Sequence, residues 1–380
     1  MTALRVLHVA SNLPRWGGIE RHICDVAPAL AARGHEVAVV CPPGSPIEQR
    51  LRESTVRTIP LTITRLHDWG KLLPFMRAMR GRYDVVHTHQ GWDRMVPGVA
   101  AYLRGVRAVV MSQHAAPKFR ASGLLLQRIL YDGIVAVSGV VGRLLLENGI
   151  SPERVFVVQN GIDVGRWRSE PPTPVRKQLS IPSDAFLVVG AGRLSTDQDK
   201  GFAFLVRALA LARRRGVNAF CLIAGRGDPL PLKNLIASLD LSPFAIYLGE
   251  RRDIPGLFAA ANAVATPSTL PEGFGYSALE GLASGRPVIA SRVGGLTEIV
   301  TSKVGYLLPP GDPEAISHAI EDLAADRDKC RRMGEAALAR ANQFSLDESV
   351  GKLERVYECI LNRSDNGTES FASRGVESCH

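Results

Sequence analysis

Short β-rich runs alternate with helical patterns along nearly the whole of this 380-residue chain. Such alternation joins parallel strands through right-handed crossovers, so it predicts the α/β class with doubly wound sheets. In the first half, the helical patterns cover Ile19–Arg33, Trp69–Arg80 and Gly139–Asn148. The strands predicted there are Arg5–Ala10, Glu36–Cys41, Asp84–His87, Ala108–Gln113, Gly133–Val137 and Val155–Val158.

The second half repeats the alternation after a break at Asp163–Ser183, where four prolines and many polar residues indicate a linker. Its predicted strands are Phe186–Ala191, Ala219–Ala224, Ala245–Leu248, Ala263–Thr266, Pro287–Ser291 and Gly305–Leu308. Its predicted helices are Gly201–Arg215, Pro231–Leu239, Ile254–Ala260, Ser277–Ala283 and Pro313–Ala325. Sheets of this kind bind ligands outside the C-terminal ends of their strands.

These patterns predict two Rossmann-like domains that face each other across a cleft. The first domain covers residues 1–165, the second covers residues 184–346, and residues 166–183 link them. A further amphipathic helix at 347–361 is expected to pack back onto the first domain. The tail at 362–380 is polar and has few core residues, so we expect it to be disordered.

Composition limits the class and location of the protein. Apolar residues make up 46% of the chain, which is enough for each half to bury its own core. No run reaches the ~18 to 20 apolar residues of a membrane span, and the short Leu4–Ala10 run favours a first strand over a signal peptide. Six cysteines without C-x-x-C spacing favour reduced thiols over a disulfide framework or a cysteine-ligated zinc site. We therefore expect a cytoplasmic protein.

The net charge of +9 is concentrated in the first half. Residues 1–165 carry 20 Lys and Arg against 12 Asp and Glu, whereas residues 166–380 carry 26 against 25. A basic domain favours an anionic partner, which includes lipid headgroups, a phosphorylated acceptor and nucleic acid. Aromatic residues make up only 6% and no stacking or recognition motif is present, so nucleic-acid binding is a distant alternative.

The segment from Pro271 to Glu298 carries the most specific chemistry. Glu272 and the glycines that follow it form a loop between a predicted strand and a predicted helix, and Glu280 lies in that helix. Glycines let backbone amides approach a ligand closely, and a helix N-terminus favours a diphosphate. Carboxylates accept hydrogen bonds from sugar and ribose hydroxyls. The segment therefore predicts a site for a sugar diphosphate.

Two further features fit a diphosphate. Arg193 and Lys200 lie at a strand end and at the start of the next helix, where they can stabilise a leaving group without a metal. Gly17 and Gly18 follow the first strand and open a helix, so their amides can also meet a phosphate, although an ordinary strand-to-helix turn explains them as well. No G-x-G-x-x-G or Walker A pattern is present.

The ordered series of motifs resembles the retaining glycosyltransferases of family 4, which have the two-domain GT-B fold. Glu272 and Glu280 form its E-x7-E motif, and the resemblance extends over about residues 4 to 361. Its other marks are Gly17–Glu20, Asp84–His89, Asn160–Asp163, Gly192–Leu194 with Lys200–Gly201, and Gly294–Glu298.

The resemblance implies a role for each candidate residue. Glu272 would contact hydroxyls of the donor sugar, and Glu280 would hold the ribose. Backbone amides at Phe274 and Gly275 would meet the sugar and diphosphate. His114 would face the donor sugar, and Arg193 and Lys200 would stabilise the leaving group. The acidic insert that contains Asp197 and Asp199, between Arg193 and Lys200, departs from the family pattern. Its negative charges would weaken the positive field that these two cations create.

Histidines His87, His89 and His114 follow or end predicted strands, and His8 lies inside the first strand. We expect no metal, because no carboxylate or cysteine spacing completes a site. His8 is expected in the core. For His89, packing beside the cleft and a role in the cleft are equally open. Asp93 and Arg94 are further candidates for acceptor contact.

The sequence therefore predicts transfer of a hexose-type unit from a nucleoside diphosphate sugar to a hydroxyl, with retention of anomeric configuration. A GT-B-type nucleotide-sugar epimerase is the alternative. The acceptor expected by analogy is a cell-envelope glycan or lipid-linked saccharide, as in lipopolysaccharide or exopolysaccharide biosynthesis. The motifs do not distinguish UDP-sugar, GDP-sugar and ADP-sugar donors.

Leu66–Arg82 joins apolar residues to Lys71, Arg77, Arg80 and Arg82. It can lie on an anionic inner leaflet as a peripheral segment, and the same holds for Lys118, Phe119 and Arg120. For Leu66–Arg82 we favour an ordinary crossover helix, with Pro74 as a possible break, and the same preference against membrane contact extends to Lys118, Phe119 and Arg120.

Overall fold

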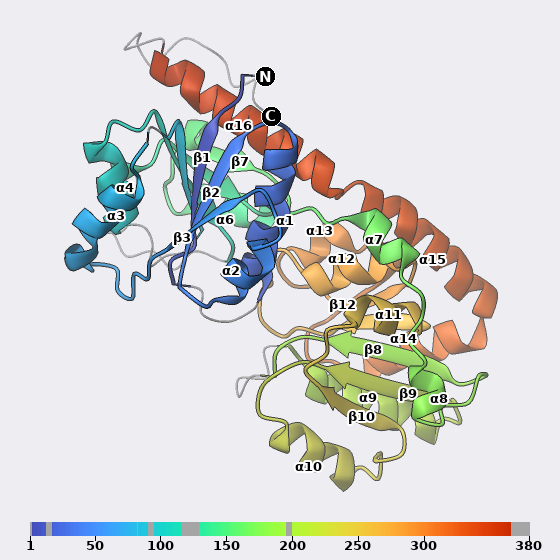
Figure 1. Cartoon of the computed structure of the whole chain (residues 1–380). Coiled ribbons are helices and arrows are strands. Elements are labelled where there is room, and N and C mark those ends of the chain that lie inside the picture. The colour runs from blue at the N-terminus through green and yellow to red at the C-terminus, as the bar shows by residue number, and fades with distance from the viewer. Residues whose placement is uncertain are drawn as a thin grey trace. The chain divides into compact units, whose positions relative to one another are not determined.

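The computed structural model describes residues 2–12, 17–81, 83–89, 95–115, 129–194 and 200–365. Two compact units make up the chain (Figure 1): Met1–Gly161 with Leu346–His380, and Ile162–Ser345. Among the described residues, each unit contains one sheet, and the paired strands of both sheets are parallel. The predicted α/β class with doubly wound sheets is confirmed.

The first sheet has seven strands in the order β3-β2-β1-β4-β5-β6-β7. Their bounds are β1 Arg5–Val9, β2 Glu36–Cys41, β3 Arg57–Pro60, β4 Val85–Thr88, β5 Ala108–Gln113, β6 Gly133–Ala136 and β7 Val155–Val157. The direction of strand addition reverses between β1 and β4, which makes this the switch point of the sheet. Sequence patterns missed β3, a short edge strand that ends in a proline.

The helices of the first unit connect these strands and cover the sheet. They are α1 Gly18–Ala32, α2 Pro46–Leu51, η1 Trp69–Lys71, α3 Leu72–Ala78, α4 Met95–Leu103, α6 Gly139–Glu147, η2 Pro152–Arg154 and α16 Leu346–Asp365. Ser45 and Ser138 cap α2 and α6 by accepting bonds from Glu48 N and Val141 N. Pro74 lies in the first turn of α3, where its missing N–H costs no helical hydrogen bond.

Helix α16 joins the core of the first unit although it comes from the far end of the sequence. Its Val350, Leu353 and Val356 are buried with strand residues such as Val6 and Val110. Polar contacts hold its first turns: Glu354 accepts from Arg33 Nη1 at 2.6 Å and pairs with His35 Nε2 at 3.0 Å. The helix reaches Asp365, four residues beyond the predicted end.

The second sheet has six strands in the order β10-β9-β8-β11-β12-β13. Their bounds are β8 Phe186–Ala191, β9 Ala219–Ala224, β10 Ala245–Gly249, β11 Ala263–Thr266, β12 Val288–Ser291 and β13 Gly305–Leu308. The helices of this unit are α7 Val164–Ser169, α8 Val175–Gln178, α9 Phe202–Arg214, α10 Leu230–Ser238, α11 Ile254–Ala259, α12 Tyr276–Ala283, α13 Leu296–Ile299, α14 Pro313–Ala325 and α15 Arg327–Asn342. Its switch point lies between β8 and β11.

Residues 166–183 differ from the linker expected there, because they contain most of α7 and all of α8 and belong to the second unit. Asp163 caps α7, and Trp167 packs its buried ring 5.9 Å from that of Phe258. Val175 is also buried. Apolar anchors among the prolines thus fix this segment to the second unit.

Within the described residues, no helix is long and apolar enough to cross a membrane. Cys24, Cys41, Cys221 and Cys330 are free thiols, but Cys359 is disulfide-bonded, so the expectation of reduced thiols is wrong at that position. Several predictions lie outside the described residues: Arg82, Asp93, Arg94, Lys118, Phe119, Arg120, Asp197, Asp199 and most of the tail.

Candidate functional site

The first group of candidate residues lies at the switch point of the second sheet. Strand β8 leads to Gly192 and Arg193, and β11 leads to the loop that carries Glu272. Since β8 and β11 are parallel neighbours, both segments leave the same edge of the sheet. Doubly wound sheets bind ligands at this place.

Two glycines allow the segments around this edge to approach each other. Gly201 has a φ of +66°, and a Cβ there would lie 1.8 Å from the carbonyl oxygen of Pro267. Gly294 has a φ of +50°, and its Cβ would lie 2.0 Å from the carbonyl oxygen of Glu272. Only glycine fits at either position, because a side chain would overlap with backbone. The loop after β11 is therefore held between the start of α9 and the start of α13.

This packing brings the predicted Glu272 and Lys200 together. Oε1 of Glu272 lies 2.5 Å from Nζ of Lys200 and also accepts a hydrogen bond from Ser268 Oγ at 2.5 Å. The side chains of Lys200 and Glu272 are 31% and 20% exposed, so solvent and ligands reach both. Ser268 was not predicted; it is buried next to the strand end, and its place in the same loop was the available signal.

Helix α12 begins at the end of the same loop. Its N-cap Gly275 has a φ of +111° and has no side chain with which to cap the helix. Free N–H groups at a helix N-terminus bind anions well. Ser277 Oγ donates to the carbonyl oxygen of Ala191 at 3.0 Å and so fixes the helix start beside β8.

The two remaining predicted residues of this segment are buried. The ring of Phe274 packs 5.7 Å from Tyr276 and 6.0 Å from Phe344, so only its backbone is available to a ligand. Glu280 lies on the second turn of α12 and is 7% exposed. Arg193 is exposed after β8.

The second group of candidates lies in the first unit. Gly17 and Gly18 are exposed at the N-terminus of α1, and Gly17 has extended backbone and no side-chain cap. His22 follows one turn later on the same helix, and its ring centre lies 5.1 Å from that of His114. Sequence reasoning missed His22, because nothing in the chain pattern places a helical residue beside a particular strand end.

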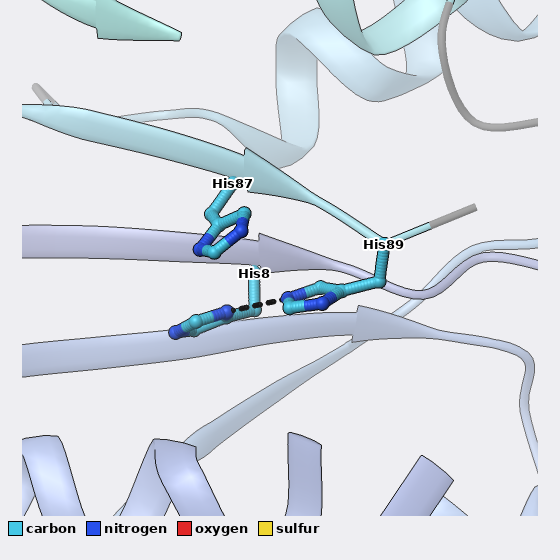
Figure 2. Close-up of side chains that lie close together, drawn as sticks. All are labelled: His8, His87 and His89. Atoms are coloured by element: carbon cyan, nitrogen blue, oxygen red, sulfur yellow. Dashed lines mark hydrogen bonds between the residues drawn. The ribbon is translucent and has the colours of Figure 1, made fainter. Parts of the chain in front are cut away.

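Five histidine rings gather near the switch point of the first sheet: His8, His22, His87, His89 and His114. Figure 2 shows three of them, with His8 Nδ1 hydrogen-bonded to His89 Nε2 at 2.9 Å. His8 and His87 are fully buried, His89 and His22 nearly so, and His114 is partly exposed. Burial of His8 agrees with its prediction as a core residue.

Burial keeps these rings uncharged at neutral pH, because an imidazolium loses its hydration in the protein interior. It lowers the pKa of His8 to about 3, with a smaller contribution from nearby His22, and lowers that of His22 to about 4. The pKa values of His87, His89 and His114 are also lowered well below 6.5, again mainly by burial.

Two sets of ring nitrogens lie within 4.8 Å of one another and could in principle hold a metal ion. One set comes from His8, His87 and His89, and the other from His22, His89 and His114. In the first set, His87 already uses both nitrogens: Nδ1 bonds Tyr357 Oη at 2.6 Å and Nε2 bonds Ser112 Oγ at 2.8 Å. Hydroxyl groups therefore compete with a cation for that ring.

Comparison with protein families gives two matches that together span most of the chain. Residues 173–340 match the model of the group 1 glycosyl transferases, and residues 16–166 match the model of glycosyltransferase family 4. The second match covers His22, His87, His89 and His114 of the histidine cluster but not His8, and the first covers Glu272 and Lys200.

Curated relatives are similar over nearly their full length. D-inositol 3-phosphate glycosyltransferase of Nocardia farcinica is 30% identical over 91% of this chain and 85% of its own. The enzyme of the same name from Streptomyces scabiei is 28% identical over 91% of this chain and 87% of its own. Among solved structures, Anabaena HepE in complex with UDP and glucose has a TM-score of 0.83 at 23% identity, covering 93% of this chain and 99% of that one.

Proposed function

The chain belongs to the group 1 glycosyltransferases, which have the GT-B fold, and from this premise we propose that it moves a hexose unit from a nucleoside diphosphate sugar to a hydroxyl group. The observation that carries the proposal is the group formed by Glu272, Lys200 and the N-terminus of α12, whose N-cap glycine has no side chain, at one switch point. This group combines a carboxylate that can accept hydrogen bonds from hydroxyl groups, a cationic side chain, and backbone amides that can bind an anion.

Each residue of this group has a proposed role. Glu272 accepts hydrogen bonds from hydroxyls of the donor sugar, and Glu280 holds the ribose. Amides of Phe274, Gly275 and the first turn of α12 bind the diphosphate, and in the first unit those of Gly17 and Gly18 do the same. Arg193 and Lys200 stabilise the negative charge that grows on the leaving phosphate, so no metal is required. Lys200 exchanges its partner Glu272 for phosphate when donor binds.

We propose that the reaction retains the anomeric configuration. The bond between the sugar C1 and the phosphate oxygen breaks, and the acceptor oxygen forms a bond to C1 on the same face. The acceptor proton moves to the departing phosphate oxygen. No carboxylate of this sequence is assigned as a nucleophile, so the protein contributes orientation and charge stabilisation.

The proposed acceptor is anionic: a phosphorylated or lipid-linked saccharide of the cell envelope. Its support is the excess of basic residues in 1–165 and the name of the relatives, which act on D-inositol 3-phosphate. Supplying phosphorylated, lipid-linked and neutral sugars in parallel tests this. Preferred use of the charged acceptors, with rates that fall as salt rises, is expected. Equal use of neutral sugars would contradict it.

A peripheral association with anionic lipid is proposed for α3 and α4, which lie side by side (Figure 1). Trp69 and Leu73 are 46% and 63% exposed, and Tyr102 and Leu103 are 70% and 57% exposed. Exposed cations accompany them: Arg77, Arg80, Arg104 and Arg107. Apolar side chains among cations suit the cytoplasmic face of an anionic membrane.

Vesicle flotation tests this association. Vesicles rich in phosphatidylglycerol should bind the protein, and phosphatidylcholine vesicles should not. Replacing Trp69 and Leu73 by serine should abolish binding, whereas the same change at Leu230, an equally exposed leucine of the second unit, should leave it intact. Binding that is unaffected by the first pair of changes would place the contact elsewhere.

Thermal-shift screening against UDP, GDP and ADP tests the donor proposal, because a ligand of the native state raises its melting temperature. One nucleotide should shift the transition, and EDTA should not prevent it. Incubating the matching nucleotide sugar without acceptor separates the alternative activity: a glycosyltransferase leaves the sugar configuration unchanged, whereas an epimerase converts it. The absence of any shift with all three nucleotides would contradict the proposal.

A further inference from the structure

Three histidines of the cluster form a continuous hydrogen-bonded row. Nδ1 of His8 lies 2.9 Å from Nε2 of His89, and Nδ1 of His89 lies 3.2 Å from Nε2 of His114. The three rings come from β1, from the residue after β4 and from the residue after β5. The row therefore runs from the interior of the sheet toward its C-terminal edge (Figure 2 shows the first two rings).

The two ends of the row differ in their surroundings. Nε2 of His8, at the inner end, is buried and has no hydrogen-bond partner among the described residues. His8 shares its face of β1 with Val6 and Ala10, which belong to the apolar core. His114, at the outer end, is partly exposed, and it joins the row through its Nε2.

Neutral imidazole carries one N–H group and one bare nitrogen, so only two proton arrangements of the row keep both of its hydrogen bonds. In the first, His8 and His89 both donate from Nδ1, and His114 is left with its proton on Nδ1. In the second, every proton moves to Nε2, and the bonds run in the opposite direction. The lowered pKa values of the three rings exclude a charged intermediate arrangement at neutral pH.

The buried end decides between these arrangements. In the second arrangement, His8 would place an N–H group without an acceptor in the apolar core. Buried N–H groups without a partner are rarer in proteins than incompletely paired acceptors. In the first arrangement, the unpaired atom is only a bare nitrogen. The first arrangement is therefore favoured.

We propose that His8 and His89 are positioning residues that set the tautomer of His114, so that His114 offers its Nδ1–H group to a substrate hydroxyl. The proposal rests on the sugar-transfer function proposed above. His114 then acts as a hydrogen-bond donor to an oxygen of the substrate, and the hydroxyl keeps its own proton free to bond elsewhere. A His114 with bare Nδ1 would instead require a proton from that hydroxyl.

The first proton arrangement also disfavours binding of a metal ion by His22, His89 and His114. A cation that used His89 Nδ1, the nitrogen that faces His114, would need its lone pair, but this nitrogen carries a proton in the first arrangement. The proton would have to move to His89 Nε2, which forces His8 into its unfavourable form. A proton on His89 Nδ1 and a metal ion bound to the same nitrogen therefore exclude each other.

Long-range ¹H–¹⁵N correlation on the full chain labelled with ¹⁵N-histidine tests the proposal directly. His114, assigned from a His114→Gln sample, should show a protonated Nδ1 and a bare Nε2. His35 is an internal standard of the opposite tautomer, because its Nδ1 accepts from Leu4 N at 3.1 Å and its Nε2 faces Glu354. A protonated Nε2 on His114 would overturn the proposal, and so would ring shifts on adding zinc that EDTA reverses.

Two variants separate positioning from packing. His89→Phe keeps a ring but removes the donor, whereas His89→Asn retains an N–H group near the Nδ1 position. His89→Phe should give mixed His114 tautomers and lower kcat/KM for the nucleotide sugar roughly tenfold, while His89→Asn should stay within about threefold. An unchanged His114 tautomer in His89→Phe would refute the proposal. Because the tautomer is measured without substrate, its failure is distinct from a failure to find sugar transfer.

Discussion

Acidification should destabilise the first unit through its buried histidines. When the pKa of a histidine is lower in the folded state than in the unfolded chain, protons bind preferentially to the unfolded chain as the pH falls. The histidine therefore contributes stability above about pH 6.5, and this stability is lost as the pH falls toward the pKa of the folded state. Burial lowers the pKa of His8 to about 3 and that of His22 to about 4. The loss should therefore begin below about pH 6.5 and continue to about pH 4 for His22 and about pH 3 for His8.

The size of the effect follows from proton linkage. At about pH 5, protonation of one unfolded histidine favours unfolding by about 2 kcal/mol relative to about pH 7.5, while the folded ring stays neutral. His8 and His22 together therefore remove about 4 kcal/mol. This is a large share of a typical unfolding free energy of about 5 to 15 kcal/mol.

Urea unfolding followed by hydrogen exchange of β1 and β4 measures the first unit separately at each pH. His22→Phe should reduce the difference between about pH 7.5 and about pH 5 by about 2 kcal/mol, whatever its effect on absolute stability. His318→Gln, at an exposed position on α14, should leave the difference unchanged. If the wild-type difference is below about 1 kcal/mol, or if His22→Phe leaves it intact, the histidines are not held neutral by burial.

Two further substitutions test the packing that supports the sites. Gly201→Ala should destabilise the second unit by about 2 kcal/mol or more in urea unfolding. The reason is that residue 201 has a φ of +66° and that an added Cβ would overlap with the carbonyl oxygen of Pro267. Unchanged stability would contradict this close approach. Tyr357→Phe should lower the free energy of unfolding of the first unit by about 1 kcal/mol, because it removes the hydroxyl that bonds His87 at 2.6 Å. The loss is measured as a shift of the urea midpoint. An unchanged midpoint would mean that this hydrogen bond contributes no net stability.

Much of the fold follows from local sequence patterns. The strand Ala219–Ala224 is buried and apolar throughout, and so is Glu36–Cys41 after its exposed first residue, which is typical of parallel sheets; the predicted bounds of both match the structure. Helix α15 escaped prediction because it buries only Gly334, Ala337 and Ala341 and shows no continuous apolar stripe. Such a helix depends on its neighbours in the fold.

The candidate site was predictable in position but not in its contacts. Loops after parallel strands lie at one sheet edge, so Glu272 and Lys200 could be placed together from the sequence. Their direct pairing depends on the approach of Gly201 to the backbone of Pro267, which is a tertiary contact. The row from His8 through His89 to His114 likewise needs the strand register of β1 and β4, which no local pattern gives.

Release of nucleoside diphosphate from a nucleotide sugar in the presence of acceptor tests the central claim most directly. The wild-type protein should release it with EDTA present, and the Glu272→Ala, Lys200→Ala double variant should lose at least about a hundredfold in kcat/KM. Lys233→Ala, at an exposed lysine of α10 in the same unit, should retain full activity. Full activity in the double variant, or no release with any nucleotide sugar, would contradict the account.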